Sequence, residues 1–401
     1  MKIFQINTVA NSGSTGRITE GIGQEIINKG WESYIAYGRY ANPSSSHLIK
    51  IGNKIDHYFH AFLTRLTDKH GLGSKYYTNK LIREIKKIDP DIIHLHNIHG
   101  YYINLQILFN YLRKSNKPVV WTLHDCWSFT GHCSYYEYVE CSKWLTGCYS
   151  CPQKREYPKS ILFDRSKQNY ADKKRIFNSV ENLTIVPVSK WLEGEVKKSF
   201  LKNHNIVTIQ NGIDLEKFYP RENSDEIFER YNIGGKKIIL GVASTWDKRK
   251  GLEYFFKVAE MLPENLQIIL VGLSESQLKS LPPKIIGIKR TESIDQLAEL
   301  YSVASVFVNP TLEDTYPTTN LEAIACGTPV ITFKSGGSPE SVNDATGVVV
   351  EKGNIAELLQ EILKITDIGK ERFYSPCRTY ALENFDKKQK FQEYIDLYKK
   401  L

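Results

Sequence analysis

The chain has 401 residues, of which 41% are hydrophobic and 24% are charged, as is ordinary for a soluble globular protein with room for two domains. No apolar run approaches the roughly 20 residues of a membrane-spanning helix, and residues 1–16 predict a β-strand instead of a signal peptide, so we expect a cytoplasmic protein. The formal net charge of +8 favours a phosphate-bearing ligand or an anionic membrane surface, unless it only reflects a lysine-rich composition, and no nucleic-acid-binding motif accompanies it.

Short apolar, β-branched runs alternate with stretches of helical periodicity along the whole chain. In the first half they predict strands at Lys2–Asn7, Asp91–Asn97, Pro118–His124 and Leu183–Ser189. In the second half they predict strands at Lys237–Ala243, Leu266–Gly272, Val306–Pro310 and Pro329–Phe333. Such strands are typical of parallel sheets covered on both faces. We therefore predict an α/β fold with two doubly wound, Rossmann-like domains that face each other across a cleft.

The predicted domain limits follow from this alternation. The first domain covers residues 1–205 and the second covers residues 206–384. A C-terminal helix within residues 385–401 follows the second sheet and can pack back on the first domain.

A glycine-rich turn, Asn11–Gly16, follows the first predicted strand and leads into a helical pattern. Gly13 and Gly16 let the backbone approach a ligand closely, and the N-terminus of the helix offers N–H groups to an anion. The spacing differs from that of the dinucleotide-binding motif, so a purely structural turn is the alternative.

A helical stripe of large apolar side chains comes next, at Ile55, Tyr58, Phe59, Phe62, Leu63 and Leu66. Between Lys50 and Lys87 there are nine lysines or arginines and three acids. A basic amphipathic helix can lie on an anionic bilayer and reach a lipid-linked molecule. An ordinary helix packed on the sheet is the alternative.

Histidines lie at the ends of the next two predicted strands. His94, His96 and His99 belong to the first of them, and His124 with Asp125 ends the second. A metal site is one interpretation, but the alternation of His94 and His96 with Leu95 favours core or hydrogen-bonded histidines. Because ligands of open α/β sheets bind at the carboxyl ends of strands, His124 is the best placed to face a ligand.

Four of the seven cysteines, Cys133, Cys141, Cys148 and Cys151, fall within 19 residues after this strand. The Cys148-x-x-Cys151 pair has the spacing of a zinc knuckle, and Cys133 and Cys141 can complete a tetrahedral structural zinc site. Free thiols and disulfides are the alternatives, although a cytoplasmic location disfavours disulfides. His132 and Cys126 are alternative ligands.

In the second half, the segment Thr245–Gly251 follows a strand and carries Lys248, Arg249 and Lys250. Cationic side chains beside a helix N-terminus suit a diphosphate, because the side chains and the helix dipole attract the same anion. A solvated basic loop is the alternative.

A later strand leads to Glu313 and Asp314, followed by a helix that carries Glu322 and stops at Gly327. A carboxylate in such a position can accept two hydrogen bonds from a vicinal diol, such as that of a ribose.

With this segment the sequence resembles the family 4 retaining glycosyltransferases, which have the two-domain GT-B architecture. The family carries two acids separated by seven residues, the second within a Glu-Ala-x-Ala-x-Gly-x-Pro run, and Glu322–Pro329 matches that run. The first acid is Asp314 in place of Glu, with Glu313 beside it. Asn211–Asp214 is similar to the interdomain hinge signature of the family.

The resemblance implies roles for residues already named. Glu322 would bind the ribose, Lys250 the diphosphate, and Asp314 and His124 the donor sugar, so that these four residues form the catalytic set. The turn of Gly13 and Gly16 would face the phosphate and the acceptor. The arginine that the family usually carries after a glycine is absent here, so Lys248 or Arg249 would supply its charge.

The implied activity is that of a retaining, metal-independent, hexosyltransferase-like enzyme with a nucleoside-diphosphate sugar as donor and a glycan or lipid-linked acceptor. The first domain would bind the acceptor and the second the nucleotide sugar. The stretches HLHNIHGYYIN and HDCWSFTGHC resemble a subset linked to bacterial capsule, exopolysaccharide or lipopolysaccharide assembly, which implies work at the inner face of the membrane. The alternative is a nucleotide-sugar-binding sensor or an inactive partner subunit, because Asp314 and the missing arginine depart from the family pattern.

Overall fold

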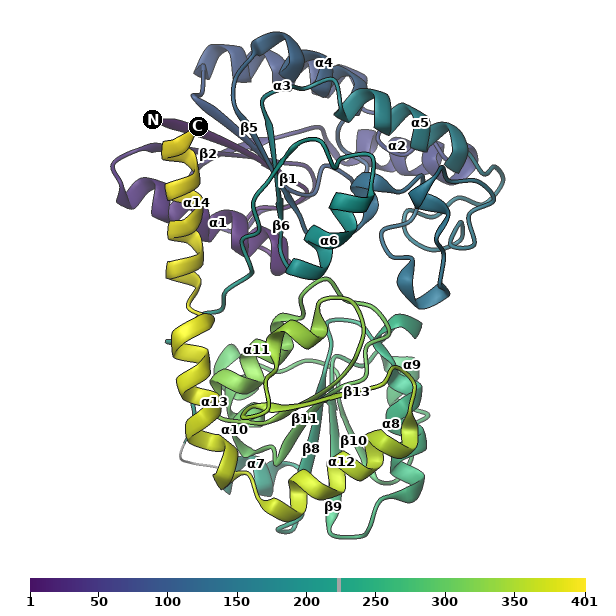
Figure 1. Cartoon of the computed structure of the whole chain (residues 1–401), viewed down its shortest axis with the longest axis vertical. Helices are drawn as coiled ribbons and strands as arrows, with labels where there is room; N and C mark the ends of the chain where they lie inside the picture. The colour runs from purple at the N-terminus through teal and green to yellow at the C-terminus, as the bar shows by residue number, and fades with distance from the viewer. Residues whose placement is uncertain (222–224) are drawn as a thin grey trace. The chain divides into compact units, whose positions relative to one another are not determined.

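The computed structural model describes residues 1–221 and 225–401 (Figure 1). Contacts divide the chain into two compact units, each built on its own parallel sheet. The N-terminal unit comprises Met1–Gln210 and Lys390–Leu401, and the C-terminal unit comprises Asn211–Gln389. The prediction of two doubly wound α/β domains is confirmed.

The N-terminal unit contains seven strands in the order β3-β2-β1-β4-β5-β6-β7, and every neighbouring pair is parallel. The strands are β1 (Lys2–Asn7), β2 (Glu32–Tyr37), β3 (His47–Lys50), β4 (Ile92–Leu95), β5 (Val119–Leu123), β6 (Leu183–Pro187) and β7 (Asn205–Ile206). The strand order reverses between β1 and β4, which creates the switch point at which proteins of this class bind ligands.

The helices of this unit are α1 (Gly13–Asn28), α2 (Lys54–Thr67), α3 (Lys75–Ile88), α4 (Leu105–Ser115), α5 (Ser166–Phe177) and α6 (Lys190–Lys198). The connection from β5 to α5 is long and irregular. Its residues 126–165, which we call the cysteine insertion, contain three short 3-10 turns, η1 (Trp127–Phe129), η2 (Glu137–Val139) and η3 (Lys143–Leu145).

The C-terminal helix α14 (Lys387–Lys400) completes the core of the N-terminal unit. Its buried side chains pack with isoleucines of α1, and Figure 1 shows the two helices side by side. A Cβ atom on Gly21 of α1 would come within 2.1 Å of the Phe391 ring, so this close approach requires glycine. Tyr398 also contacts the sheet, because its hydroxyl lies 2.6 Å from Nδ1 of His94.

The C-terminal unit contains six parallel strands in the order β10-β9-β8-β11-β12-β13. The strands are β8 (Lys237–Val242), β9 (Leu266–Val271), β10 (Ile285–Ile288), β11 (Val306–Asn309), β12 (Val330–Phe333) and β13 (Gly347–Val350). The helices are α7 (Asp225–Arg230), α8 (Leu252–Met261), α9 (Glu275–Leu278), α10 (Ile294–Val303), α11 (Thr318–Ala325), α12 (Ile355–Ile368) and α13 (Glu371–Asn384), with 3-10 turns η4 (Lys248–Lys250) and η5 (Ser338–Ser341).

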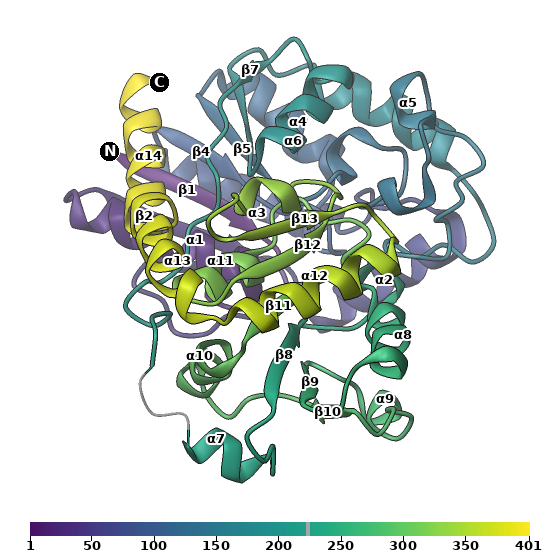
Figure 2. The same ribbon diagram turned by 60° about the horizontal axis from the view of Figure 1, so that its bottom comes forward.

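The two faces of this second sheet are covered by different helices. Val306 and Val308 of β11 pack into one core with α8 and α12, and Figure 2 shows α12 running along β11 to β13. Phe307 points to the opposite face, where its ring meets Tyr301 of α10. This alternation explains why Val306, Phe307 and Val308 are all apolar. Within the described ranges, no helix has both the length and the apolar character needed to cross a bilayer.

Candidate active site

The candidate donor site of the C-terminal unit lies at the carboxyl ends of β8 and β11, where the strand order reverses. The chain leaves β8 and reaches the basic turn Lys248–Lys250. It leaves β11 and reaches Glu313 and Asp314. The two segments are joined at the backbone, because Leu312 N donates a hydrogen bond to Arg249 O at 2.7 Å.

Lys250, Arg249 and Asp314 form one charged cluster at this edge. Lys250 Nζ lies 2.5 Å from Asp314 Oδ2, and Arg249 Nη1 lies 3.8 Å from the same oxygen. The same Arg249 nitrogen donates a hydrogen bond to the backbone carbonyl of Glu313 at 2.7 Å. The three side chains are only 14 to 18% exposed. Their charges are therefore only weakly screened by water.

Local backbone geometry fixes the position of Lys250. Its N–H donates to Asp247 Oδ1 at 3.1 Å, so Asp247 caps the turn. Gly251 follows with φ of +74°, and a Cβ atom there would lie 2.1 Å from Pro310 O. Only glycine fits this position. Helix α8 begins at Leu252, which places the basic turn directly before a helix N-terminus.

The charges of the cluster are mutually stabilising. Burial alone would raise the pKa of Asp314, but the charges of Lys250 and Arg249 outweigh burial and hold that pKa below its ordinary value. Asp314 is therefore ionised at neutral pH. An anion that enters this edge competes with Asp314 for Lys250, and a displaced Asp314 carboxylate can accept hydrogen bonds from hydroxyl groups.

Glu322 lies on α11, the helix that follows β11, as the sequence predicts. The hydroxyl of the buried Tyr301 donates a hydrogen bond to Glu322 Oε2 at 2.9 Å. Burial, with the neighbouring Glu322 carboxylate, raises the pKa of Tyr301 well above its ordinary value. Tyr301 therefore stays protonated and fixes the orientation of the Glu322 carboxylate. Gly327, with φ of +77°, follows the end of this helix.

The structure distinguishes the alternatives that the sequence left open here. Glu313 is fully buried, whereas Asp314 retains partial exposure and contacts the two cations. Lys248 is exposed, whereas Arg249 joins the cluster. Asp314 and Arg249 are thus the members of each pair that lie beside Lys250.

In the N-terminal unit, the glycine-rich turn begins α1. Gly13 has φ of +59° and faces open space, whereas a Cβ atom on Gly16 would lie 3.0 Å from a methyl group of Val9. Ser12, the residue at the N-cap position, makes no side-chain cap hydrogen bond. The side chain of Ser12 therefore leaves the first N–H groups of α1 uncapped. Uncapped N–H groups are what an anion binds at a helix N-terminus.

The histidines of β4 and β5 are hydrogen-bonded within this unit. His96 Nδ1 lies 3.3 Å from His124 Nε2, and His96 Nε2 lies 3.1 Å from Gln5 Oε1. His94 is buried against Tyr398 of α14. His124 follows the end of β5 and is partly exposed. Burial lowers the pKa of His124 to about 4, so its imidazole is neutral at pH 7.

A second pair at the same edge consists of His99 and Asp125, whose contact was not predicted from the sequence. His99 Nε2 lies 2.9 Å from Asp125 Oδ2, and His99 Nδ1 lies 2.9 Å from the hydroxyl of Tyr157. Burial would raise the pKa of Asp125, but the contact with His99 outweighs burial and lowers it. A small cavity is lined by His96, His99, His124, Asp125, Trp127 and neighbouring residues. The neighbouring strand ends were a usable signal for His99 and Asp125, whereas no local pattern indicated Tyr157.

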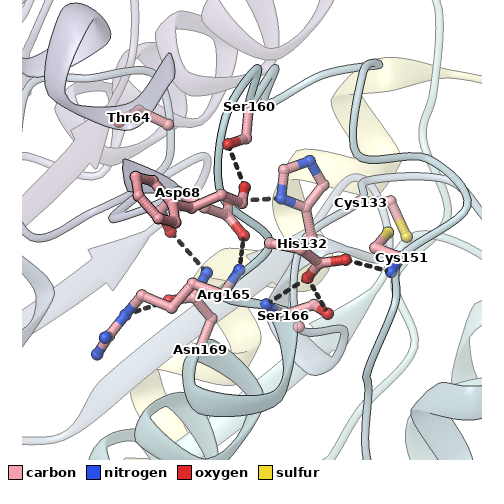
Figure 3. Close-up of polar contacts among 12 residues, drawn as sticks. Thr64, Asp68, His132, Cys133, Cys151, Ser160, Arg165, Ser166 and Asn169 are labelled. Carbon is pink, nitrogen blue, oxygen red and sulfur yellow. Dashed lines mark hydrogen bonds and ion pairs between the residues drawn. The ribbon is translucent and has the colours of Figure 1, made fainter. Parts of the chain in front are cut away.

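The four clustered cysteines lie around one small cavity in the cysteine insertion. Cys133, Cys141, Cys148 and Cys151 all line it. Every cysteine of the chain is present as a thiol, and Figure 3 shows the sulfur atoms of Cys133 and Cys151 side by side. Across residues 1–221 and 225–401, no three His, Cys, Asp or Glu side chains are arranged as the ligands of a metal ion. The four-cysteine zinc site therefore stays a prediction.

The stripe predicted on α2 is largely exposed. The exposed fractions are 79% for Ile55, 75% for Tyr58, 58% for Phe59 and 55% for Phe62. The buried positions of α2 are the polar residues His60 and Thr64. The neighbouring cysteine insertion adds three further exposed apolar residues, Ile161, Leu162 and Phe163. The two segments adjoin, since the N–H of Ile161 donates to the carbonyl of Arg65 at 2.7 Å.

Asp68, at the C-terminal end of α2, holds the cysteine insertion against this helix (Figure 3). Its Oδ1 lies 2.6 Å from His132 Nδ1, and its Oδ2 accepts a hydrogen bond from Arg165 N at 2.7 Å. Its backbone carbonyl accepts a third bond from Asn169 Nδ2 at 2.7 Å. Asp68 and His132 are both buried, so the contact between the two apolar segments is firmly fixed.

Comparison with known proteins identifies the family to which the chain belongs. WcaC of Escherichia coli (strain K12), a glycosyl transferase named for colanic acid biosynthesis, is 25% identical over the full length of both chains. CapM of Staphylococcus aureus, named as a capsular polysaccharide biosynthesis glycosyltransferase, is 26% identical over 45% of this chain and 51% of its own.

Solved structures show the same fold. HepE of Anabaena in complex with UDP superposes with a TM-score of 0.67 and 15% identity over the whole of both chains. WaaG, a glycosyltransferase involved in lipopolysaccharide biosynthesis, has a TM-score of 0.66 and 15% identity over 99% of each chain. These neighbours share the GT-B fold.

Two family models match the sequence itself. The model for "Glycosyl transferases group 1" matches residues 236–367. The model for "Glycosyltransferase Family 4" matches residues 15–217, more than half of the chain. The protein is therefore a glycosyltransferase and belongs to glycosyltransferase family 4.

Proposed function

We propose that this enzyme transfers a hexose from a nucleoside-diphosphate sugar, with retention of anomeric configuration, to a hydroxyl group of a glycan or lipid-linked acceptor. The observation that carries the proposal is the cluster of Lys250, Arg249 and Asp314 at the switch point of the C-terminal sheet. Two cations beside a helix N-terminus suit a diphosphate. The binding of UDP and UDP-glucose by HepE supports a donor of this class.

In this proposal, Lys250 and Arg249 bind the diphosphate and stabilise the negative charge that grows on it as it leaves. Glu322, oriented by Tyr301, accepts hydrogen bonds from the ribose hydroxyls. Asp314 gives up Lys250 to the diphosphate and accepts hydrogen bonds from the donor sugar. No divalent ion is needed, because the two side-chain cations provide the charge that a metal supplies at other phosphate sites.

The N-terminal unit provides the remaining groups in the proposal. The turn of Gly13 and Gly16 faces the phosphate and the acceptor, and the neutral His124 contacts the donor sugar. The acceptor hydroxyl attacks the anomeric carbon on the face of the leaving group. The bond from that carbon to the phosphate oxygen breaks, and the departing diphosphate takes the acceptor proton. Positioning and electrostatics then supply the catalysis, without a nucleophilic side chain.

The biological setting is inferred from the relatives. WcaC and CapM are named for the synthesis of colanic acid and of capsular polysaccharide. We place this enzyme in the assembly of a bacterial surface polysaccharide, on the cytoplasmic side of the membrane where nucleotide sugars are available. A lipid-linked acceptor would then be presented at the bilayer surface.

An exposed apolar surface suits an enzyme that acts at the surface of that bilayer. We define the α2 patch as Ile55, Tyr58, Phe59 and Phe62 of α2 together with Ile161, Leu162 and Phe163 of the cysteine insertion. Exposed basic side chains belong to the same two segments, at Lys54, Arg65 and Lys159, and Lys69 follows α2 closely. Apolar side chains with basic neighbours suit the interface of an anionic membrane, where the rings enter the headgroup region and the cations contact lipid phosphates.

The function is tested by incubating the enzyme with a panel of UDP- and GDP-linked sugars and measuring release of the nucleoside diphosphate. We expect slow release without an acceptor and faster release with membrane lipids that contain the acceptor. Brief treatment with a chelator should leave the rate unchanged. Tight donor binding without any turnover would support a sensor or an inactive partner subunit instead. An absolute requirement for Mg²⁺ or Mn²⁺ would contradict the metal-independent mechanism.

A further inference from the structure

The cysteine insertion lacks the elements that normally hold a segment of its length. Between β5 and α5 it contains short 3-10 turns in place of a helix or strand. Ordered irregular segments of this length usually have a specific function or a cross-link. Its own apolar core is small, consisting mainly of Phe129, Tyr136 and Trp144, which are buried in ring-to-ring contact.

The thiols of the insertion converge on the cavity beside this aromatic core. Tyr136 and Trp144 form part of its wall, and all four clustered cysteines line it. Four thiols around one enclosed space are the chemistry of a structural zinc site, for which thiolate is the preferred ligand and tetrahedral the preferred geometry.

Local contacts already hold three of the four sulfur atoms. The Cys133 and Cys151 side chains interact, and Figure 3 shows the two sulfur atoms facing each other. Gly131 N donates to Cys148 Sγ at 3.1 Å. Cys151 is held in turn by its own N–H, which donates to Asp164 Oδ2 at 2.6 Å. An N–H bond to sulfur is typical of the contacts that orient metal ligands.

A buried cation compensates the charge that such a site would carry. Zinc bound by four thiolates has a net charge of −2. Lys173 of α5 is buried, and its Nζ donates to Trp127 O at 2.6 Å and to Thr130 O at 3.1 Å. Thiolates at Cys133 and Cys148 would be close enough to interact with this ammonium group. An anionic centre beside Lys173 gives this buried ammonium group a partner of opposite charge.

We propose that Cys133, Cys141, Cys148 and Cys151 together bind one structural zinc ion. The four thiols release their protons to water, and Zn²⁺ accepts one lone pair from each sulfur, with no change in oxidation state. In the described chain no three candidate ligands are arranged as a metal requires, so the proposal includes a movement of Cys141 and Cys148 towards Cys133 and Cys151 when zinc binds. The ion then stabilises the cysteine insertion and takes no part in sugar transfer.

His132 and Cys126, the other ligands considered from the sequence, are excluded from this set by their positions. His132 is not among the residues that line the cavity, and its Nδ1 is held by the buried Asp68 at 2.6 Å. Cys126 is buried, and its backbone N–H donates to Ser134 O at 3.0 Å, away from the residues that line the cavity. Cys126 therefore serves as a matched control for the loss of a thiol within the same insertion.

The test is the zinc content of the full-length protein, purified without a chelator from cells grown with zinc. We expect about one zinc ion per chain, released in step with modification of the four thiols by a mercurial reagent. Cys148→Ser and Cys151→Ser should each lose most of the zinc, whereas Cys126→Ala should keep it. Less than about one-tenth of an equivalent of metal in the wild type, with four titrating thiols or with two disulfides, would overturn the proposal.

A second measurement on the unmodified chain keeps the test independent of whether the variants fold. Limited proteolysis of wild-type protein should cut within residues 126–165 after zinc is stripped, and zinc should restore resistance. Unchanged cleavage with and without zinc would contradict the structural role. Neither measurement depends on sugar transfer. The zinc proposal can therefore fail while the proposed enzymatic function stands, and the enzymatic function can fail while the zinc proposal stands.

Discussion

Lys250 and Asp314 are separated by 64 residues in the chain, yet Lys250 Nζ and Asp314 Oδ2 lie 2.5 Å apart at the switch point of the C-terminal sheet. The pair joins the ends of β8 and β11, which neighbour each other in the sheet. Because both side chains are mostly buried, neither charge is well solvated by water. A diphosphate that binds at this edge must exchange one carboxylate contact of Lys250 for a phosphate contact.

Lys250→Ala should therefore slow sugar transfer strongly. Loss of one group that stabilises developing charge costs roughly 10²–10³-fold in kcat, or about 2.7–4 kcal/mol of barrier. The rate is measured as release of nucleoside diphosphate at a saturating donor concentration. Lys248→Ala is the matched control, because Lys248 belongs to the same turn but is exposed. Equal losses in the two variants would show that general positive charge, and not the Lys250 contact, is what matters.

Glu322→Gln should weaken donor binding. A neutral amide accepts hydrogen bonds less strongly than a carboxylate, and we expect the donor Kd to rise roughly tenfold or more. Tyr301→Phe should act in the same direction with a smaller effect, because it removes only the hydroxyl that orients the carboxylate. Calorimetric titration with the nucleoside diphosphate measures both. Glu371→Gln, an exposed acid at the start of α13, should bind like wild type. Wild-type affinity in Glu322→Gln would remove Glu322 from the donor site.

The N-terminal unit should lose stability in mild acid. Burial lowers the pKa of His60 to about 4, of His94 to about 3 and of His124 to about 4. In the unfolded chain each pKa is about 6.5. The unfolded state therefore takes up protons first, so the contribution of these histidines is complete above about pH 6.5 and is lost as the pH falls towards 4.

Urea unfolding followed by tryptophan fluorescence at about pH 7.5, 6 and 5 measures this loss. The free energy of unfolding should fall with each step. His94→Gln should show a weaker dependence on pH, whatever its absolute stability. Asp125 and Asp314 do not interfere, since their lowered pKa values affect stability only below about pH 4. Constant stability between pH 6.5 and 5 would contradict the prediction.

Sequence alone predicted β1, β4, β5 and β6 of the first sheet and β8, β9, β11 and β12 of the second, and it missed β2 and strands at the edges. Lys2–Asn7 was predicted with the limits that β1 has, because Ile3, Phe4 and Ile6 give this buried strand a largely apolar pattern. β3 at one edge is exposed or half-buried at every position, and β10 and β13 are only half-buried in their centres. β3 has no continuous apolar run, whereas β10 and β13 are apolar but each contains a glycine, Gly287 and Gly347, which weakens a strand pattern.

The residues of the candidate site were also predicted only in part from the sequence. Lys250, Asp314 and Glu322 were each predicted from their place after a strand or on the following helix. Tyr301 was not predictable, because its contact with Glu322 forms only once the elements pack, and the sequence did not distinguish Arg249 from Lys248. No local sequence pattern indicated that Lys173 is buried beneath the cysteine insertion. Periodicity indicates elements and strand ends, whereas pairing of side chains depends on tertiary packing.

The α2 patch should bind anionic membranes. Its exposed rings can enter the interface, and the basic side chains of the same segments can contact lipid phosphates. In sedimentation with vesicles of phosphatidylcholine and phosphatidylglycerol in equal parts, wild-type protein should be found in the pellet at low salt. The bound fraction should fall as salt rises or when phosphatidylglycerol is left out, since surface charges are then screened or removed.

The matched comparison for this patch uses exposed apolar residues elsewhere in the chain. Phe59→Glu combined with Phe62→Glu should abolish pelleting, because two carboxylates are repelled by the anionic surface and two rings are lost. Tyr374→Glu combined with Leu382→Glu, on α13 of the C-terminal unit, changes residues of 43% and 49% exposure and should leave pelleting intact. If wild-type protein stays in the supernatant at low salt, or if both double variants lose binding equally, the α2 patch is not a membrane-binding surface.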